Sequence, residues 1–275
     1  MFNCPLEPLI KMLLCGFFRL PHLFLAKIIA MKEGLILRKC ITSLVAGVTV
    51  SALLLTLGNS GNISWFPPVI VFPLVGIVLI LALVFPFIWQ REERTNPQFS
   101  KKTYAFLYAF IRYCIAFNIA CFGWKKVFGL QFIVPPEISA MPMSQQSGEW
   151  LTWYYYGYSA AFGLIVALLQ IVGAGLLLFR KTLLAGLIIL FPLMLNIALV
   201  DIFYKMNMGA LLQAVVITAG LMFLLLLHYK LLLSIFFSTT SALPSLYFKS
   251  PAIKQLLRLS VVVLSLLFTL YIKRL

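Results

Sequence analysis

Apolar residues form long runs along this chain, and most charged residues fall between the runs rather than within them. A helix that crosses a bilayer needs about 20 apolar residues, and six runs are long enough. The runs are apolar all round, which favours membrane helices over strands that alternate apolar and polar residues. We place the six spans at residues 40–58, 69–89, 103–123, 158–179, 183–200 and 209–227.

A seventh run, at residues 259–272, has 14 residues free of charge. It crosses a membrane only if the side chains of Lys254 and Arg258, which precede it, extend their charged ends to the interface. Otherwise this segment lies on the membrane surface. The pattern therefore predicts six or seven spans, joined by short links and by one longer outer loop at residues 124–157.

Composition strengthens this interpretation. Apolar residues make up 63% of the 275 residues, against about 45–50% in soluble domains. Charged residues make up 11%, and the mean hydropathy is +1.04. A soluble globular enzyme and a disordered chain are both excluded. The predicted fold class is all-α, a polytopic transmembrane helical bundle, and its first partner is the lipid bilayer.

The net charge of +15 predicts how the bundle is oriented. With the N-terminus inside, at least 16 of the 22 Lys and Arg residues fall on the inner side, as the positive-inside rule requires. These cations lie between apolar runs and form no face of a soluble domain, so we reject nucleic acid as a partner. We expect a multi-pass protein of the bacterial inner (cytoplasmic) membrane with a cytoplasmic N-terminus.

The chain divides into four segments. Residues 1–35 form either an amphipathic segment on the inner leaflet or a stretch that precedes a natural start at Met31. Residues 36–102 hold two transmembrane helices, and residues 103–228 hold four more. Residues 229–275 form a C-terminal amphipathic segment and the possible seventh span.

Polar side chains inside a bilayer are costly, so each needs a partner or a cavity. Arg112, near the middle of the third span, either anchors an anionic or carbonyl-bearing ligand or serves as a hydrogen-bonding hub between helices. Gln170 lies at mid-depth in the fourth span. The remaining candidates lie in the outer thirds or at the outer ends of the spans: Asn118, Lys126, Asn196, Asp201 and Tyr204.

The depth of these residues predicts a polar pocket on the outer side of spans three to five, with Arg112 and Gln170 at its floor. The alternative is that the Asn and Gln side chains only form hydrogen bonds between helices. No metal site is predicted, because the five cysteines form no CxxC and the two histidines lie near the inner surface. No cofactor is evident, although a quinone is possible.

Several patches of the third to sixth spans resemble a known family. They are Arg112-Tyr113, the stretch from Phe122 to Phe132, Trp153 to Ser159, Gly175 to Thr182, and Asn196 to Tyr204. In this order they resemble DoxX-like membrane proteins, over roughly residues 85–235. The resemblance implies a four-helix core at 103–228 and adds Gln131 to the candidate ligand residues. Many relatives have Glu where this chain has Gln170, which weakens any mechanism that needs a proton carrier there.

The DoxX-like family is linked to a thiosulfate:quinone oxidoreductase subunit and to membrane parts of thiol-redox systems. The resemblance therefore implies a redox-associated subunit that binds a quinone or a similar lipid-soluble ligand, oriented by Arg112, in the outer half of the bundle. A redox protein would be its partner, and any enzymatic role would be that of a quinone-linked oxidoreductase subunit. The alternatives are a non-catalytic scaffold or assembly factor of a membrane complex and, less favoured, a small-solute transporter.

Overall fold

The computed structural model describes residues 36–58, 66–238 and 250–273. Within these residues the regular elements are helices. The segment at residues 1–35, and with it the question of Met31, lies outside them. Contacts divide the chain into two compact units, Met1–Tyr229 and Lys230–Leu275.

Seven helices are long and apolar enough to cross a membrane, which confirms the predicted polytopic all-α fold. In the first unit they are α3 (Ile36–Leu57), α4 (Pro68–Thr95), α5 (Pro97–Val127), α8 (Ala160–Leu178), α9 (Leu183–Phe203) and α10 (Met208–Leu227). The second unit begins within the short α11 (Tyr229–Leu233), continues through η3 (Ser234–Ser238) and contains α12 (Pro251–Ile272). The Gln255–Ile272 part of α12 is the seventh candidate span, so the doubtful run is long enough when it includes Arg258.

Side-chain caps explain where three of these helices begin. The Asn96 side chain accepts a hydrogen bond from Gln98 N at 3.1 Å, and Ser159 and Asn207 accept equivalent bonds from Phe162 N and Ala210 N. Each cap satisfies a backbone N–H that has no partner within its own helix. The starts of α5, α8 and α10 are therefore set by local sequence.

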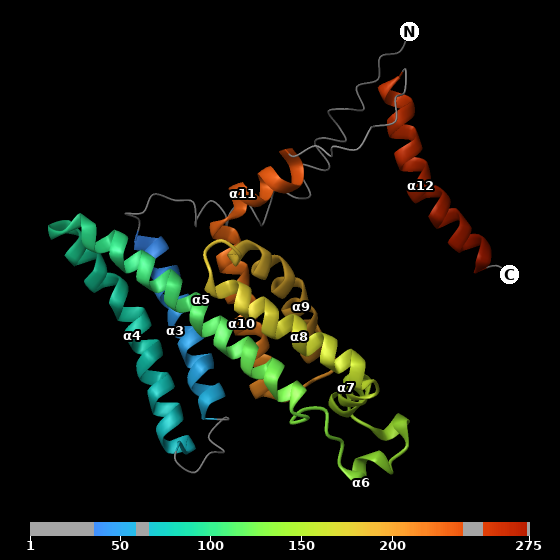
Figure 1. The fold of residues 1–275 in the computed structure, drawn as a ribbon, viewed down its shortest axis with the longest axis horizontal. Coiled ribbons are helices and arrows are strands. Elements are labelled where there is room, and N and C mark those ends of the chain that lie inside the picture. The colour runs from blue at the N-terminus through green and yellow to red at the C-terminus, as the bar shows by residue number, and fades with distance from the viewer. Residues whose placement is uncertain (1–35, 59–65, 239–249, 274–275) are drawn as a thin grey trace. The chain divides into compact units, whose positions relative to one another are not determined.

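The six spanning helices of the first unit form a bundle, in which α5 packs against both α3 and α8 (Figure 1). The α4 helix packs on α3, and α9 packs between α8 and α10. The core lies where these helices meet and consists of apolar side chains such as Ile111, Ile115, Leu187, Leu190 and Leu221. This burial holds the bundle together by close packing, which is the main attraction between helices in lipid.

The stretch 124–157, predicted as a loop, contains helices: α6 (Pro136–Ser139), the 3-10 turn η2 (Met143–Gln145) and α7 (Gly148–Gly157). The loop prediction was wrong for α7, whose ten residues are too few to span a bilayer. Its Trp and Tyr residues suit the membrane–water interface instead. Tertiary packing against α8 and α9 fixes this helix, and the sequence pattern alone does not reveal such packing.

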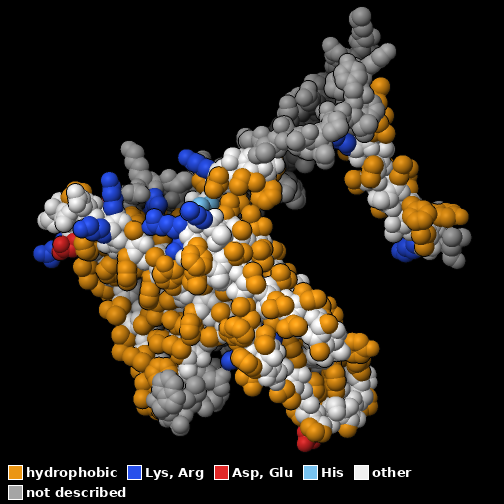
Figure 2. Space-filling view, in the orientation of Figure 1, with side chains coloured by type: hydrophobic (Ala, Val, Ile, Leu, Met, Phe, Trp, Pro, Cys, Tyr) orange, Lys and Arg blue, Asp and Glu red, His pale blue; other side chains and the backbone are white. Residues whose placement is uncertain are grey.

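Most basic side chains of the bundle gather at one end, which we call the basic end (Figure 2). It includes the starts of α3 and α5 and the ends of α8 and α10. The opposite end carries α7 and is called the α7 end (Figure 1). This segregation is the arrangement that the positive-inside rule requires, and the cytoplasmic location of the basic end stays a prediction.

Candidate functional site

A cavity of about 180 Å³ lies inside the bundle at the α7 end. Side chains of α5, α7, α8, α9 and α10 line it, together with residues of the two connections at 131–132 and 206–207. Its polar lining residues are Lys126, Gln131, Thr152, Gln170, Asp201 and Asn207. The cavity therefore lies at one end of the third to sixth spans.

Two glycines allow the cavity walls to approach one another. A Cβ on Gly123 of α5 would lie 2.7 Å from the Ile171 side chain of α8, so only glycine permits this helix contact. A Cβ on Gly148 would lie 2.4 Å from Tyr204 O, where the first residue of α7 meets the end of α9. The Asn207 side chain then fastens α7 by donating to Glu149 Oε1 at 3.2 Å. The α7 helix thus closes the cavity at this end.

Gln170 is the most deeply buried polar residue of the lining, with 1% of its surface exposed. Its Nε2 donates a long bond to Met194 Sδ at 3.7 Å. Its Oε1 is buried and has no hydrogen-bond partner among the described residues. Such a group costs about 1–3 kcal/mol, so this acceptor in a cavity wall needs an explanation beyond packing.

Lys126 and Asp201 give the cavity one charge of each sign. Lys126 Nζ donates to Phe122 O at 3.3 Å and lies 5.7 Å from the centre of the Phe132 ring. Asp201 is 6% exposed and attracts Lys126 electrostatically. The i, i+4 spacing of Asp201 and Lys205 also permits a local ion pair, but within the described residues no such pair forms inside 4.0 Å. Asp201 instead lines the cavity.

Aromatic rings form the rim of the cavity. Phe132 has a φ of 67°, a left-handed conformation that is strained for a bulky residue. This backbone places its ring in a stack with Tyr156 at 5.2 Å between centres, and edge-on to Trp153. Burial raises the pKa of Tyr156, and electrostatic interactions with Tyr155 and Asp201 add to the effect. The Tyr156 phenol therefore stays protonated at neutral pH and can donate a hydrogen bond.

Arg112 is not at the floor of this cavity, so that part of the predicted pocket is wrong. Its Nη2 donates to Leu178 O, the last residue of α8, at 3.4 Å and to Tyr113 OH at 3.3 Å. Its side chain therefore extends toward the basic end and satisfies a carbonyl at a helix C-terminus. The position of a residue along a helix sets the depth of its α-carbon, whereas the long side chain of Arg112 carries the charge away from that level.

Three further candidates lie outside the cavity. Asn118 accepts a bond from Thr56 Oγ1 of α3 at 2.5 Å and donates to Cys114 O, so it joins helices. Asn196 and Tyr204 are exposed on α9 and just after it. Helix rotation explains these corrections, because residues at the right depth can point to any side. Of the eight candidates, the structure brings Lys126, Gln131, Gln170 and Asp201 together.

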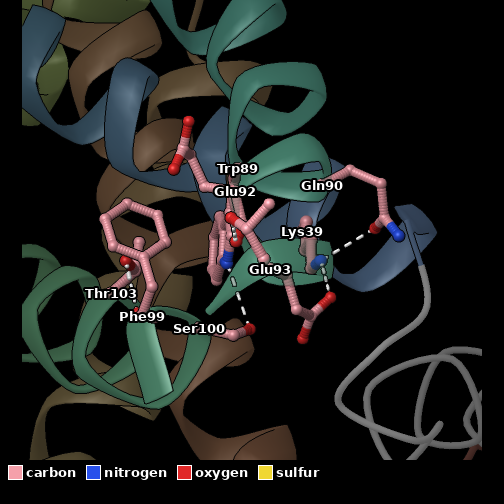
Figure 3. Close-up of polar contacts among 9 residues, drawn as sticks. Lys39, Trp89, Gln90, Glu92, Glu93, Phe99, Ser100 and Thr103 are labelled. Carbon is pink, nitrogen blue, oxygen red and sulfur yellow. Dashed lines mark hydrogen bonds and ion pairs between the residues drawn. The ribbon is translucent and has the colours of Figure 1, made fainter. Parts of the chain in front are cut away.

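A buried charge cluster that the sequence pattern did not predict lies near the basic end (Figure 3). Lys39 of α3 has no exposed surface and pairs with Glu93 of α4, and it also donates to Gln90 Oε1 at 2.7 Å. Beside it, Trp89 Nε1 donates to Ser100 Oγ at 3.1 Å and links α4 to α5. From its position in the sequence, Lys39 counts among the basic residues that indicate the inner side of the membrane. Its pairing with the Glu93 carboxylate shows that it also joins α3 to α4.

Part of the cavity lining was not predicted as site residues, namely Thr152, Trp153, Tyr156 and Asn207. The dense aromatic residues of α7, which follow a glycine, were the available signal for the first three. Aromatic residues with a polar tip are enriched where an apolar region meets a wet one. Because residues 124–157 were predicted to form a loop, these aromatic residues were not considered as cavity lining.

Comparison with known proteins does not assign the chain to a family. No family model matches the chain, and no solved structure matches it. One curated relative, "Uncharacterized protein YwoB" of Bacillus subtilis (strain 168), is 35% identical over 94 residues. That match covers 34% of this chain and 59% of the relative. The DoxX-like assignment therefore stays a prediction.

Proposed function

We propose that this protein is a redox-associated membrane subunit that binds a quinone, or a similar lipid-soluble ring compound, in the α7-end cavity. The proposal is carried by Gln170, which lines the cavity and whose buried Oε1 has no hydrogen-bond partner among the described residues. An apolar cavity of about 150 Å³ binds benzene, so 180 Å³ suits one substituted six-membered ring. The resemblance to DoxX-like proteins points in the same direction.

The lining can serve both redox forms of such a ring. A quinone carbonyl accepts hydrogen bonds, which Lys126 and the Tyr156 phenol can donate. A quinol hydroxyl donates, and Gln170 Oε1 and Asp201 can accept. The Gln170 amide can also turn over and offer its NH₂ group, because the two ends of an amide have the same shape. Lys126 and Asp201 balance each other's charge, which fits a ligand without net charge.

The electrons would be exchanged with a partner protein, because the sequence contains no CxxC dithiol pair. Under this proposal the chain holds and orients the ring while the partner supplies the redox centre. The competing proposal is a non-catalytic scaffold or assembly factor of a membrane complex. Under it, the cavity takes no ring ligand, and substitutions in its wall affect stability alone.

The test uses the full chain in neutral detergent and the ring probe duroquinone, with its quinol. For the wild type we expect a rise in melting temperature with increasing probe; a ligand at a hundred times its dissociation constant adds about 2.7 kcal/mol. Gln170→Leu removes one hydrogen bond to the probe, worth about 1 kcal/mol. We therefore expect about fivefold weaker binding of the probe.

The same substitution has an opposite effect without a probe. Because Gln170→Leu deletes an unpartnered buried acceptor, we expect the free protein to be unchanged or more stable by up to about 1 kcal/mol. Gln213→Leu is the matched control, since Gln213 is also buried in a spanning helix but does not line the cavity. The proposal is contradicted if duroquinone does not raise the melting temperature of the wild type, or if the Gln170→Leu variant responds to duroquinone like the wild type. Either result favours the scaffold proposal.

A further inference from the structure

A second and larger pocket, of about 910 Å³, lies at the basic end of the bundle. It is lined by residues of α3 and α5, of the connection between α8 and α9, and of the start of α9 and the end of α10. The charged side chains of its lining are all basic: Arg38, Lys101, Arg112 and Arg180, with the imidazole of His228 beside them. No carboxylate lines this pocket among the residues that the structure describes. Lys101, Arg112 and Arg180 therefore give its described lining a positive charge, in contrast to the cavity at the α7 end.

Arg112 gives this pocket a buried hydrogen-bond donor. The residue is 8% exposed, and its Nη2 makes the two bonds to Leu178 O and Tyr113 OH. Its Nε is buried and has no partner among the described residues. A guanidinium has five N–H donors in a planar fork. The contacts within the bundle therefore leave part of this fork for an acceptor in the pocket.

The helix ends at this pocket do not neutralise its cations. The C-termini of α8 and α10 carry partial negative charge, but each already has a donor. Arg112 serves the end of α8, and His228 Nδ1 lies 3.0 Å from Leu224 O at the end of α10. Arg38 donates to the Tyr108 hydroxyl at 3.1 Å, which fixes its side chain at the pocket wall. The positive potential of Lys101 and Arg180 adds to these groups.

We propose that the basic-end pocket binds a phosphate group, and that its source is the head group of an anionic phospholipid. Arginine forks match the oxygens of phosphate in charge and geometry. Basic pockets between transmembrane helices are typical sites for anionic lipid head groups. The remaining wall includes Leu183, Leu224 and Leu227, which suit acyl chains. A soluble phosphate shares the polar chemistry but makes no use of this apolar wall.

The test compares the thermal stability of the full chain in neutral detergent with three probes: phosphatidylglycerol, phosphatidylcholine and inorganic phosphate. The test variant is Lys101→Gln with Arg180→Gln, since both residues line the pocket and are exposed enough to tolerate the change. The matched control is Arg91→Gln with Arg94→Gln, which removes two exposed cations that do not line the pocket. Arg112 is left intact because it also serves α8.

We expect phosphatidylglycerol to stabilise the wild type more than phosphatidylcholine, whose choline cation neutralises the same phosphodiester. At about 1 kcal/mol for each cation near an anionic lipid, the test variant binds phosphatidylglycerol about 30-fold more weakly. The control keeps the wild-type response. If inorganic phosphate alone reproduces the effect and the test variant abolishes it, the phosphate site stands and its ligand is soluble.

Two results overturn the proposal. One is equal stabilisation by phosphatidylglycerol and phosphatidylcholine together with no effect of inorganic phosphate. The other is a test variant that responds like the control. Neither result bears on the quinone proposal, because the two pockets share no lining residue among those described.

Discussion

The two ends of the bundle are built from the same helices but present opposite chemistry. The α7-end cavity is small, rimmed by aromatic rings, and holds one cation and one carboxylate in its wall. The basic-end pocket is about five times larger and is lined by cations without a carboxylate among the described residues. Balanced charge around a ring-sized space suits a neutral ligand, whereas unbalanced positive charge suits an anion.

One helix shows how this difference arises. Arg112 and Lys126 both lie on α5, 14 residues apart, which is about 21 Å along the axis. Arg112 extends toward the end of α8, and Lys126 lies in the cavity with Asp201. The same helix therefore supplies a cation to each end. The neighbouring helices determine the contacts of each cation, namely Leu178 O for Arg112 and the cavity with Asp201 for Lys126.

Orientation is the broadest test of this comparison, because its outcome is all-or-none. If the basic end faces the cytoplasm, reporter fusions after Thr95 and Lys181 report a cytoplasmic location, and a fusion after Ala140 reports an external one. Paired alkaline phosphatase and fluorescent protein reporters measure this. An external signal at Thr95 would reverse the bundle and place the basic-end pocket away from the inner leaflet.

The largest energetic effect is expected at Lys39, which lies near the basic end and pairs with the carboxylate of Glu93. Glu93→Gln leaves the buried Lys39 ammonium with neutral neighbours, which costs about 3 kcal/mol. Thermal unfolding in detergent measures the loss. Adding Lys39→Met to this variant restores much of the stability, because the unpaired charge is then removed.

Glu92→Gln is the control for this prediction, since Glu92 is exposed and adjacent in sequence. It should change stability little. We also expect Glu93→Gln to keep the preference for phosphatidylglycerol, because neither Lys39 nor Glu93 lines the pocket. A loss of that preference would show that the Lys39–Glu93 ion pair contributes to lipid binding and is not separate from the basic-end pocket.

A smaller effect is expected for Arg112→Gln. It removes the bonds to Leu178 O and Tyr113 OH, which together contribute about 1–2 kcal/mol. We expect a lower melting temperature and a weaker response to phosphatidylglycerol. The response to duroquinone should stay at the wild-type level when compared as a temperature shift. A lost duroquinone response would return Arg112 to the ligand-orienting role that its depth in the sequence first indicated.

The sequence predicts the helices well for a simple physical reason. A bilayer imposes length and apolarity on each span, so the runs starting near residues 40 and 209 end close to the limits of α3 and α10. The extra length of α4 and α5 was not predicted, because polar residues such as Arg94 and Lys101 can continue a helix beyond the membrane. The α7 helix was missed because packing, rather than apolarity, fixes it.

The sequence predicts the depth of a polar residue but not the direction in which it points. Gln170, Lys126 and Asp201 reach the cavity, while Asn118, at a comparable depth, turns to Thr56 of α3. Helix rotation sets this difference, and rotation depends on close contacts such as that of Gly123 with α8. The pairing of Lys39 with Glu93 could not be predicted either, because the two residues lie 54 positions apart in the chain.

The most direct test of two chemically distinct ends measures both probes on both variants. Wild type, Gln170→Leu and the Lys101→Gln, Arg180→Gln variant are each titrated with duroquinone and with phosphatidylglycerol, and the shift in melting temperature is recorded. We expect Gln170→Leu to weaken only the duroquinone response and the double variant to weaken only the phosphatidylglycerol response. If each variant weakens both responses equally, the ends do not act independently and the account is contradicted.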